Sequence, residues 1–251
     1  MTRAEDAKIK DVRDNAKKTL SLNDLGIKEI SNELLECASL VKLNLANNKI
    51  SEISDQIYRL QSLEIMSFYN NRLTELPKCI SGFQMLRRLT VSHNAIREIP
   101  QGFGTSPSLE YLDFSENKIS IITANFGYLT TLKVLHLSDN NLTALPKEFG
   151  LLKSLRQLIL RDNKITVIGE EIGNLEQLRI LNIQGNLVRT LPHSLLRTKL
   201  ALQDSKLLIV ANPLSKTITT LMKKGGTICL FKKMRDMGSE GWDKLQETGG
   251  V

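Results

Sequence analysis

The sequence predicts an α/β solenoid, a chain wound into short coils of equal length, and three observations support this prediction. Leucines recur every 23 residues from Leu40 to Leu178. Each of them opens the pattern L-x-x-L-x-L-x-x-N-x-L, as in the unit that begins at Leu132. Hydrophobic residues make up 41% of the chain but aromatic residues only 5%, so the core must be aliphatic. A fixed period of this length is typical of stacked structural repeats.

The pattern indicates a leucine-rich repeat horseshoe, with a parallel β-sheet on the concave face and helical caps at both ends. Alternation of inward and outward side chains makes the segment L-x-x-L-x-L a short strand. Strands of successive repeats then pair in parallel, and bulkier return segments curve the stack with the strands inside. Each return segment carries one inward apolar residue: Ile57, Ile80, Phe103, Phe126, Phe149, Ile172 and Leu195.

A recurring asparagine is expected to turn inward and to hydrogen-bond backbone groups of a tight turn. It stands at the same place in seven units: Asn48, Asn71, Asn94, Asn117, Asn140, Asn163 and Asn186. An unpaired buried amide costs about 1–3 kcal/mol, so these hydrogen bonds matter for stability. One further unit at Leu20 precedes the seven, and another at Leu207 follows them after a three-residue insertion.

The chain divides into three predicted segments. Residues 1–18 look helical and are expected to cap the first coil, and residues 19–214 hold about nine repeats with a 23-residue period. Residues 215–251 are predicted to form a basic helical cap, broken at the glycine pair 225–226, with a frayed tail from residue 238. The apolar cap residues expected to lie on the last repeat are Ile218, Leu221, Met222, Ile228, Leu230, Phe231 and Met234.

The net charge of +7 is concentrated in residues 213–237, where six basic residues accompany one acidic residue. The repeats are nearly neutral, whereas a nucleic-acid binder is expected to show a basic stripe on its main surface. We therefore expect no nucleic-acid partner. Membrane contact through the basic C-terminal cap is an alternative, although a solvated helix face is the favoured interpretation.

The chain lacks the sequence features of a secreted or membrane protein. No segment is apolar over the length that spans a bilayer, and the charged N-terminus does not resemble a signal peptide. The three cysteines, Cys37, Cys79 and Cys229, are too widely spaced for a disulfide framework or a CxxC zinc site. Together these features predict a cytoplasmic protein with reduced thiols.

The side chains between the buried leucines face the concavity and form the candidate binding face, at the third, fifth, seventh and eighth positions of each repeat. Tyr and Arg, which often anchor protein interfaces, occur there beside carboxylates and histidines. The candidate partner-binding residues are Tyr69, Arg88, His93, Tyr111, Asp113, Glu116, His136, Asp139, Arg161, Asp162 and Gln184. They include a carboxylate ladder in adjacent repeats with an arginine on either side: Glu116, Asp139 and Asp162, flanked by Arg88 and Arg161.

Two alternatives to a binding face need to be considered. Asp139 and Asp162 border the asparagine turn, so their role could be to cap loop amides. Any soluble solenoid also needs a polar inner face. However, Tyr111, His136 and Ile159 add apolar area that solubility does not require, which favours binding.

The sequence does not favour an enzyme. It contains no G-x-S-x-G, no H-E-x-x-H and no G-x-x-x-x-G-K-[ST] motif. Some candidate residues would be neighbours and could in principle hold a metal: His93, Asp113, Glu116, His136 and Asp139. Because the predicted face is open and shallow, we interpret them as contact residues instead. We expect no catalytic residue, no cofactor and no bound metal, and a monomer in isolation.

Five strings of the sequence share residues outside the repeat framework with a known family. They are FYNNRLTELPKCIS at 68–81, GFGTSPSLEYLDFSENKIS at 102–120, NFGYLTTLKVLHLSDNNL at 125–142, LILRDNKI at 158–165 and LNIQGN at 181–186. The strings occur in the same order in the Ras suppressor family of intracellular leucine-rich repeat proteins, which the chain resembles over residues 17–214.

The resemblance implies an adaptor without catalytic activity. It implies docking of a LIM-domain adaptor (PINCH type) of the integrin-linked kinase complex at cell–matrix adhesions, and modulation of Ras-linked signalling. The positions that the resemblance assigns to this contact are Tyr69, Asp113, His136, Asp139, Arg161, Asp162 and Gln184. One other function stays open, a regulatory solenoid that targets a protein phosphatase or a small GTPase.

Overall fold

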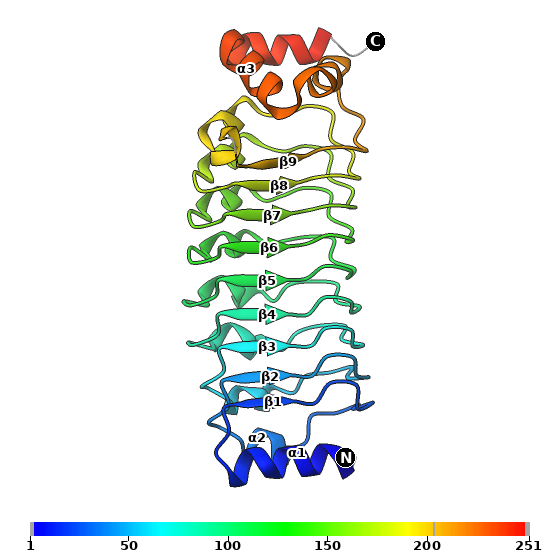
Figure 1. Cartoon of the computed structure of the whole chain (residues 1–251), viewed down its shortest axis with the longest axis vertical. Coiled ribbons are helices and arrows are strands. Elements are labelled where there is room, and N and C mark those ends of the chain that lie inside the picture. Colours follow the sequence, from blue (N-terminus) through cyan, green and yellow to red (C-terminus); the bar gives the residue numbers. More distant parts are fainter. Residues whose placement is uncertain (1–2, 203, 249–251) are drawn as a thin grey trace.

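The computed structural model describes residues 3–202 and 204–248, which form one stack of coils (Figure 1). In this part of the chain, nine strands form a single parallel sheet in sequence order. The strands are β1 (Thr19–Ser21), β2 (Lys42–Asn44), β3 (Ile65–Ser67), β4 (Arg88–Thr90), β5 (Tyr111–Asp113), β6 (Val134–His136), β7 (Gln157–Ile159), β8 (Ile180–Asn182) and β9 (Lys206–Leu208). The predicted leucine-rich repeat solenoid is confirmed.

The register of the sheet follows the period of the sequence. Thr19 of β1 lies beside Lys42 of β2, a shift of 23 positions that every following pair repeats as far as β8. Ile180 of β8 then pairs with Lys206 of β9, a shift of 26. The three extra residues are taken up in the return segment before β9, so strand alignment is not disturbed.

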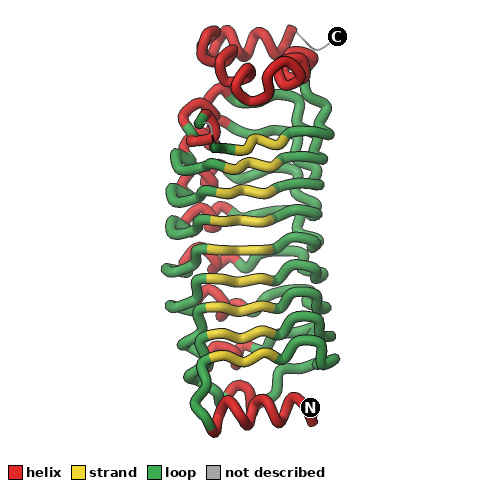
Figure 2. Tube along the Cα trace, viewed as in Figure 1, coloured by secondary structure: helices red, strands yellow, loops and turns green. Residues whose placement is uncertain are grey.

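The return segments lie behind the sheet and contain short 3-10 helices (Figure 2). These are η1 (Asp55–Arg59), η2 (Lys78–Gly82), η3 (Gln101–Thr105), η4 (Ala124–Tyr128), η5 (Lys147–Leu151), η6 (Glu170–Asn174), η7 (His193–Arg197) and η8 (Lys199–Ala201). Their predicted inward residues are all buried. Phe103, Phe126 and Phe149 stack with ring centroids 6.4 and 5.7 Å apart, which ties three consecutive coils together.

The recurring asparagines make the predicted hydrogen bonds between coils. The Asn140 side-chain oxygen accepts the Ile119 N–H at 2.9 Å, and its amide donates to the Phe114 carbonyl at 2.9 Å. Asn140 is only 6% exposed, so these bonds take the place of water. The same bonding to the preceding coil recurs at Asn48, Asn71, Asn94, Asn117, Asn163, Asn186 and Asn212.

Helices close the first coil. In α1 (Arg3–Asp14), Ile9 and Val12 are buried, and the helix contacts β1. The two side chains are three residues apart and therefore share one helix face. The short α2 (Asn32–Leu35) begins after Ser31, whose Oγ accepts the Leu34 N–H at 3.4 Å.

The element α3 (Lys216–Thr248) covers the other end (Figure 1). The predicted break is present, because Gly226 has a φ of +60°, which favours glycine. A second break falls at Gly238, with a φ of +65°. Three helical segments therefore cover this end of the stack, where α3 contacts η7 and η8 of the return segment before β9.

Two expectations about this end of the chain are wrong. Within the segment expected to fray from residue 238, residues 239–248 are helical, whereas 249–251 lie outside the described residues. Trp242 holds this segment, since its ring is fully buried and its Nε1–H donates to the Leu191 carbonyl at 2.7 Å. Ile228, expected to lie on the last repeat, is 73% exposed. Helical spacing places it about 200° from buried Leu230, and therefore on the outer face.

Candidate functional site

The strand face, meaning the exposed side chains of β1–β9 and of the turn after each strand, brings the candidate residues onto one surface. Parallel pairing in register sets equivalent positions side by side, so Arg88 lies next to Tyr111, and Asp113 next to His136. The row from Tyr69 to Gln184 runs across successive coils, and these two end residues are not brought together. The structure divides the candidates into local groups.

The central group joins Arg88, Tyr111 and His136. The Arg88 guanidinium carbon lies 4.0 Å from the centre of the Tyr111 ring, a cation–π contact. The Tyr111 and His136 rings meet edge to face at 5.5 Å. Arg88 therefore contacts an aromatic ring and does not flank the carboxylate ladder as predicted, because the third position of the repeat is separated from the eighth by the strand itself.

Burial governs the ionisation of this central group. Burial raises the pKa of the Tyr111 hydroxyl, and the nearby Asp113 carboxylate adds to the effect. Burial lowers the pKa of the His136 imidazole, which Asp113 opposes and Arg88 reinforces. His136 is therefore neutral at pH 7 and offers one donor and one acceptor to a partner.

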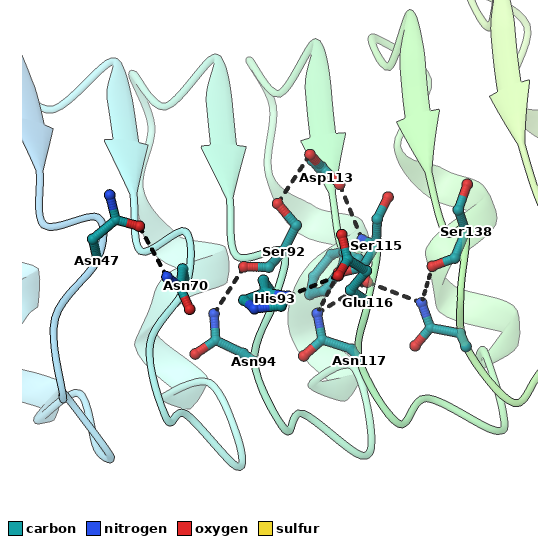
Figure 3. A network of polar contacts seen from close by, with 12 residues as sticks. Asn47, Asn70, Ser92, His93, Asn94, Asp113, Ser115, Glu116, Asn117 and Ser138 are labelled. Atoms are coloured by element: carbon teal, nitrogen blue, oxygen red, sulfur yellow. Dashed lines mark hydrogen bonds and ion pairs between the residues drawn. The ribbon is translucent and has the colours of Figure 1, made fainter.

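Asp113 is held by two hydrogen bonds (Figure 3). One carboxylate oxygen accepts the Ser92 hydroxyl at 3.1 Å, and the other accepts the Ser115 N–H at 3.0 Å. Asn44 and Asn182 cap the turn amide in the same way in their own repeats. In these three repeats loop-amide capping is thus performed by the fifth position. Neither Asp139 nor Asp162, for which capping was considered, bonds a loop amide among the described residues.

The eighth position of the repeat lies in the left-handed region of the backbone. The φ values there run from +51° to +62°, at Asp24, Asn47, Asn70, His93, Glu116, Asp139 and Asp162. Asn and Asp tolerate this conformation better than most residues. Two such pairs bond across coils, with His93 Nδ1 2.7 Å from a Glu116 oxygen and Asn70 donating to Asn47 at 3.0 Å (Figure 3).

The carboxylate ladder is only partly neutralised. Asp162 accepts the Arg161 Nε–H at 2.7 Å, and Glu116 pairs with His93. Asp139 forms no side-chain hydrogen bond with the described residues. Burial raises the pKa of Asp139, the Asp162 and Glu116 carboxylates raise it further, and Arg161 opposes them. Within the ladder, Asp139 is therefore the carboxylate left without a partner, and a cation supplied by a binding protein would stabilise its charge.

The two ends of the row differ in character. Tyr69 is exposed and stacks on His93 at 6.0 Å, which extends the aromatic surface toward β3. Gln184 is half-buried near β8, and its backbone N–H donates to the Asn182 side chain.

Sequence reasoning missed one residue that organises the face. Ser92 is only 4% exposed and orients the Asp113 carboxylate from the neighbouring coil. The available signal was the hydroxyl at the seventh position, which Ser115 and Ser138 repeat. Ser92 matters because the fifth position of the next repeat is Asp113, and the strand register places the two side chains beside each other.

The described residues contain no group of three or more His, Cys, Asp or Glu side chains placed to hold a metal ion. Among the described helices, none combines the length and apolar character needed to cross a membrane.

Two family models match the repeats, one described as leucine-rich repeat region at residues 19–142 and one as leucine rich repeat at 130–188. The chain is a leucine-rich repeat protein. Proteins of this kind use the surface of a stack of repeats for binding. No curated protein matches the sequence significantly.

Solved leucine-rich repeat structures resemble the chain over most of its length. A leucine-rich repeat protein of Leptospira interrogans is 29% identical with a TM-score of 0.70, and the match covers 81% of this chain and 57% of that one. The plant peptide hormone receptor RGFR1, in complex with RGF2, is 28% identical with a TM-score of 0.71, at 82% and 34% coverage. TLR13, in a complex with ssRNA13, is 25% identical with a TM-score of 0.68, at 79% and 29% coverage. This leucine-rich repeat protein therefore spans less than two thirds of the length of each of them.

Proposed function

We propose that this leucine-rich repeat protein is a cytoplasmic, non-catalytic scaffold whose strand face docks a folded protein partner. One observation carries the proposal. The partly exposed group of Arg88, Tyr111 and His136 lies on the same face as Asp139, a carboxylate without a side-chain partner in the described part of the chain. Aromatic and arginine side chains beside an uncompensated charge are typical of interface anchors.

The solved neighbours support binding through stacked repeats. RGFR1 is in complex with RGF2, and TLR13 is in complex with ssRNA13. For the present chain we favour a protein partner over a nucleic acid, because its repeats are nearly neutral and its strand face carries carboxylates.

The partner that we propose is a LIM-domain adaptor of the PINCH type in the integrin-linked kinase complex. The support is the resemblance of residues 17–214 to the Ras suppressor family, which also suggests modulation of Ras-linked signalling at cell–matrix adhesions. Carboxylates at Asp139 and Asp162 would steer basic patches of such a domain toward the strand face.

The proposal is tested with a purified LIM-domain fragment and isothermal titration calorimetry. The variant D139K/D162K should bind the fragment about tenfold more weakly, because two carboxylates become cations. The matched control is E75K/E98K, which makes the same charge change at exposed residues outside the strand face. This control should bind like the wild type.

A second variant separates charge from backbone strain. Asp139 and Asp162 have positive φ, where lysine is less well tolerated than asparagine. D139N/D162N keeps the backbone preference and removes only the charge, so it should also bind more weakly. Undiminished binding by both double variants would reject the assignment of this face.

A further inference from the structure

The charges along the two edges of the strand face are balanced in the N-terminal repeats and unbalanced around β6–β8. On one edge, the residue that precedes each strand alternates in sign. Arg87 forms ion pairs with Glu64 and Glu110, with N–O distances of 3.9 and 3.4 Å. Lys133, the next residue in the row, pairs with Glu110 at 2.8 Å. Every charge in this stretch of the row therefore has an opposite neighbour.

The alternation stops after Lys133. Arg156 and Arg179 take the next two places, where the backbone N–H of Arg179 donates to the Arg156 carbonyl at 2.9 Å. The place before β9 is Ser205, because Lys206 is the first residue of that strand and pairs with Ile180. Both arginine side chains are exposed, and neither forms an ion pair with the described residues. We call Arg156 and Arg179 the basic edge.

The opposite edge is acidic in the same repeats. Glu116, Asp139 and Asp162 occupy successive eighth positions in adjacent coils. The Glu116 and Asp139 N–H groups each donate, at 2.9 Å, to the carbonyl of the residue that precedes the next carboxylate. We call these three residues the acidic edge. Glu116 pairs with His93 and Asp162 with Arg161, so Asp139 is the one of the three without a side-chain partner among the described residues. Nearer the N-terminus the same row is the neutral amide pair Asn47–Asn70. Like charges on neighbouring strands repel each other, so both edges carry an electrostatic cost in the free protein.

The strip between the edges is partly apolar. Its strand positions hold half-buried Val134, Ile159 and Ile180 beside His136, Gln157 and Asn182, whereas β2 and β4 have only polar residues there: Lys42, Asn44, Arg88 and Thr90. At its C-terminal end it continues into exposed Leu208 and Val210. Arg156 and Asp162 are six positions apart in one coil, so the strip is at most about 20 Å wide. That width accommodates a single helix of about 10–12 Å diameter, with charges on both flanks reaching the edges.

From this arrangement we infer that the β6–β8 region binds one amphipathic helix of a protein partner. The helix has an apolar stripe, basic residues on one flank and acidic residues on the other. Its basic flank lies over the acidic edge and its acidic flank over the basic edge. The inference rests on the proposed function, because it specifies the chemistry of a partner that docks on the strand face.

The test uses three fluorescein-labelled helical peptides of about 18 residues, with one leucine stripe and different flanks. One peptide has a lysine flank and a glutamate flank, one has lysine on both, and one has glutamate on both. Fluorescence anisotropy should show that the wild type prefers the two-signed peptide by about threefold to tenfold, the effect of a few exposed ion pairs.

Charge reversal should change the preference in opposite directions. R156E/R179E should prefer the all-lysine peptide, and D139K/D162K the all-glutamate peptide. The control R72E/R97E reverses two exposed arginines away from both edges and should keep the wild-type preference. R156Q/R179Q, which only removes charge, should lose discrimination between the two-signed and the all-lysine peptide, and circular dichroism verifies the fold of each variant.

The outcomes distinguish this inference from the proposed function. If the wild type binds none of the peptides, or if all variants rank them alike, the inference is overturned, even when the LIM-domain fragment still binds. If the preferences change as described while the fragment does not bind, the inference stands and the proposed partner is wrong.

Discussion

Single residues determine where the backbone turns in each coil. The buried asparagines bond backbone groups of two coils, and the eighth position of the repeat adopts a positive φ. At Asp139 this conformation places a carboxylate between two others, Glu116 and Asp162. The backbone requirement explains why Asn or Asp is suitable there, but it does not explain why the charges remain unbalanced.

Asp139 should make the protein less stable as pH rises. Its pKa in the folded state is raised by burial and by Asp162, so ionisation favours unfolding. In acid the carboxyl is protonated in both states and has no effect. D139N should therefore match the wild type in urea denaturation at about pH 3 and be slightly more stable at about pH 7. The gain should shrink in a D162N background, and a D139N protein that is less stable at neutral pH would contradict the assignment.

At the scale of elements, very short strands and 3-10 helices gain their stability from neighbouring coils. Three residues of strand or one 3-10 turn do not hold their shape alone. The close approach of the return segments requires small residues at some contacts. At Gly127, a Cβ would lie 2.2 Å from the Glu148 carbonyl oxygen of the next coil.

G127A should destabilise the protein by about 1–3 kcal/mol, the usual cost of overpacking. The clash is with backbone, which can be relieved only by separating η4 from η5. The matched control is G102A, where the new Cβ would meet only the Ser81 side chain, at 2.8 Å. That hydroxyl can rotate away, so G102A should change the free energy of unfolding by less than about 0.5 kcal/mol. Equal effects of the two substitutions in urea denaturation would show that coil spacing is not the determinant.

At the scale of the whole molecule, each coil is stabilised by the coils on either side of it, and the two end coils are stabilised by the caps. Each repeat contacts mainly its neighbours, so an uncovered end exposes core residues and unfolds first. At the C-terminal end the cover depends on Trp242, and on Gln246, whose side chain accepts the Leu191 N–H at 2.7 Å.

W242A should cost about 3–5 kcal/mol, as is typical for a fully buried aromatic side chain. The loss should be local, so hydrogen exchange should accelerate first in residues 239–246 and next in the repeat at β9. W242F keeps most of the apolar area and loses only the hydrogen bond to Leu191, so its effect should be smaller. Unchanged exchange in this segment of W242A would show that the tryptophan does not hold the cap.

Much of the fold could be predicted because each repeat has the same pattern of leucines and asparagines and therefore forms the same strand and turn. The spacing of Leu132 and Leu155 predicts the strand register, and Asn140 and Asn163 predict the turns. The site was less predictable. Arg88 was expected beside carboxylates and lies on Tyr111. The loop-amide capping considered as an alternative for Asp139 is performed in other repeats by the fifth position. These contacts join residues about one repeat apart, and several partners compete for each of them.

The sequence by itself determined the coil length, the parallel sheet, the largely aliphatic core and the buried asparagines, because each depends on a pattern within one repeat. The tertiary structure alone decided which charges remain unpaired on the edges at β6–β8, and how Trp242 covers the last coil. Charge pairing depends on the distance between side chains of neighbouring coils. The directions of the three helical segments of α3 depend on the backbone angles at Gly226 and Gly238. The spacing of apolar residues in the sequence does not predict these angles.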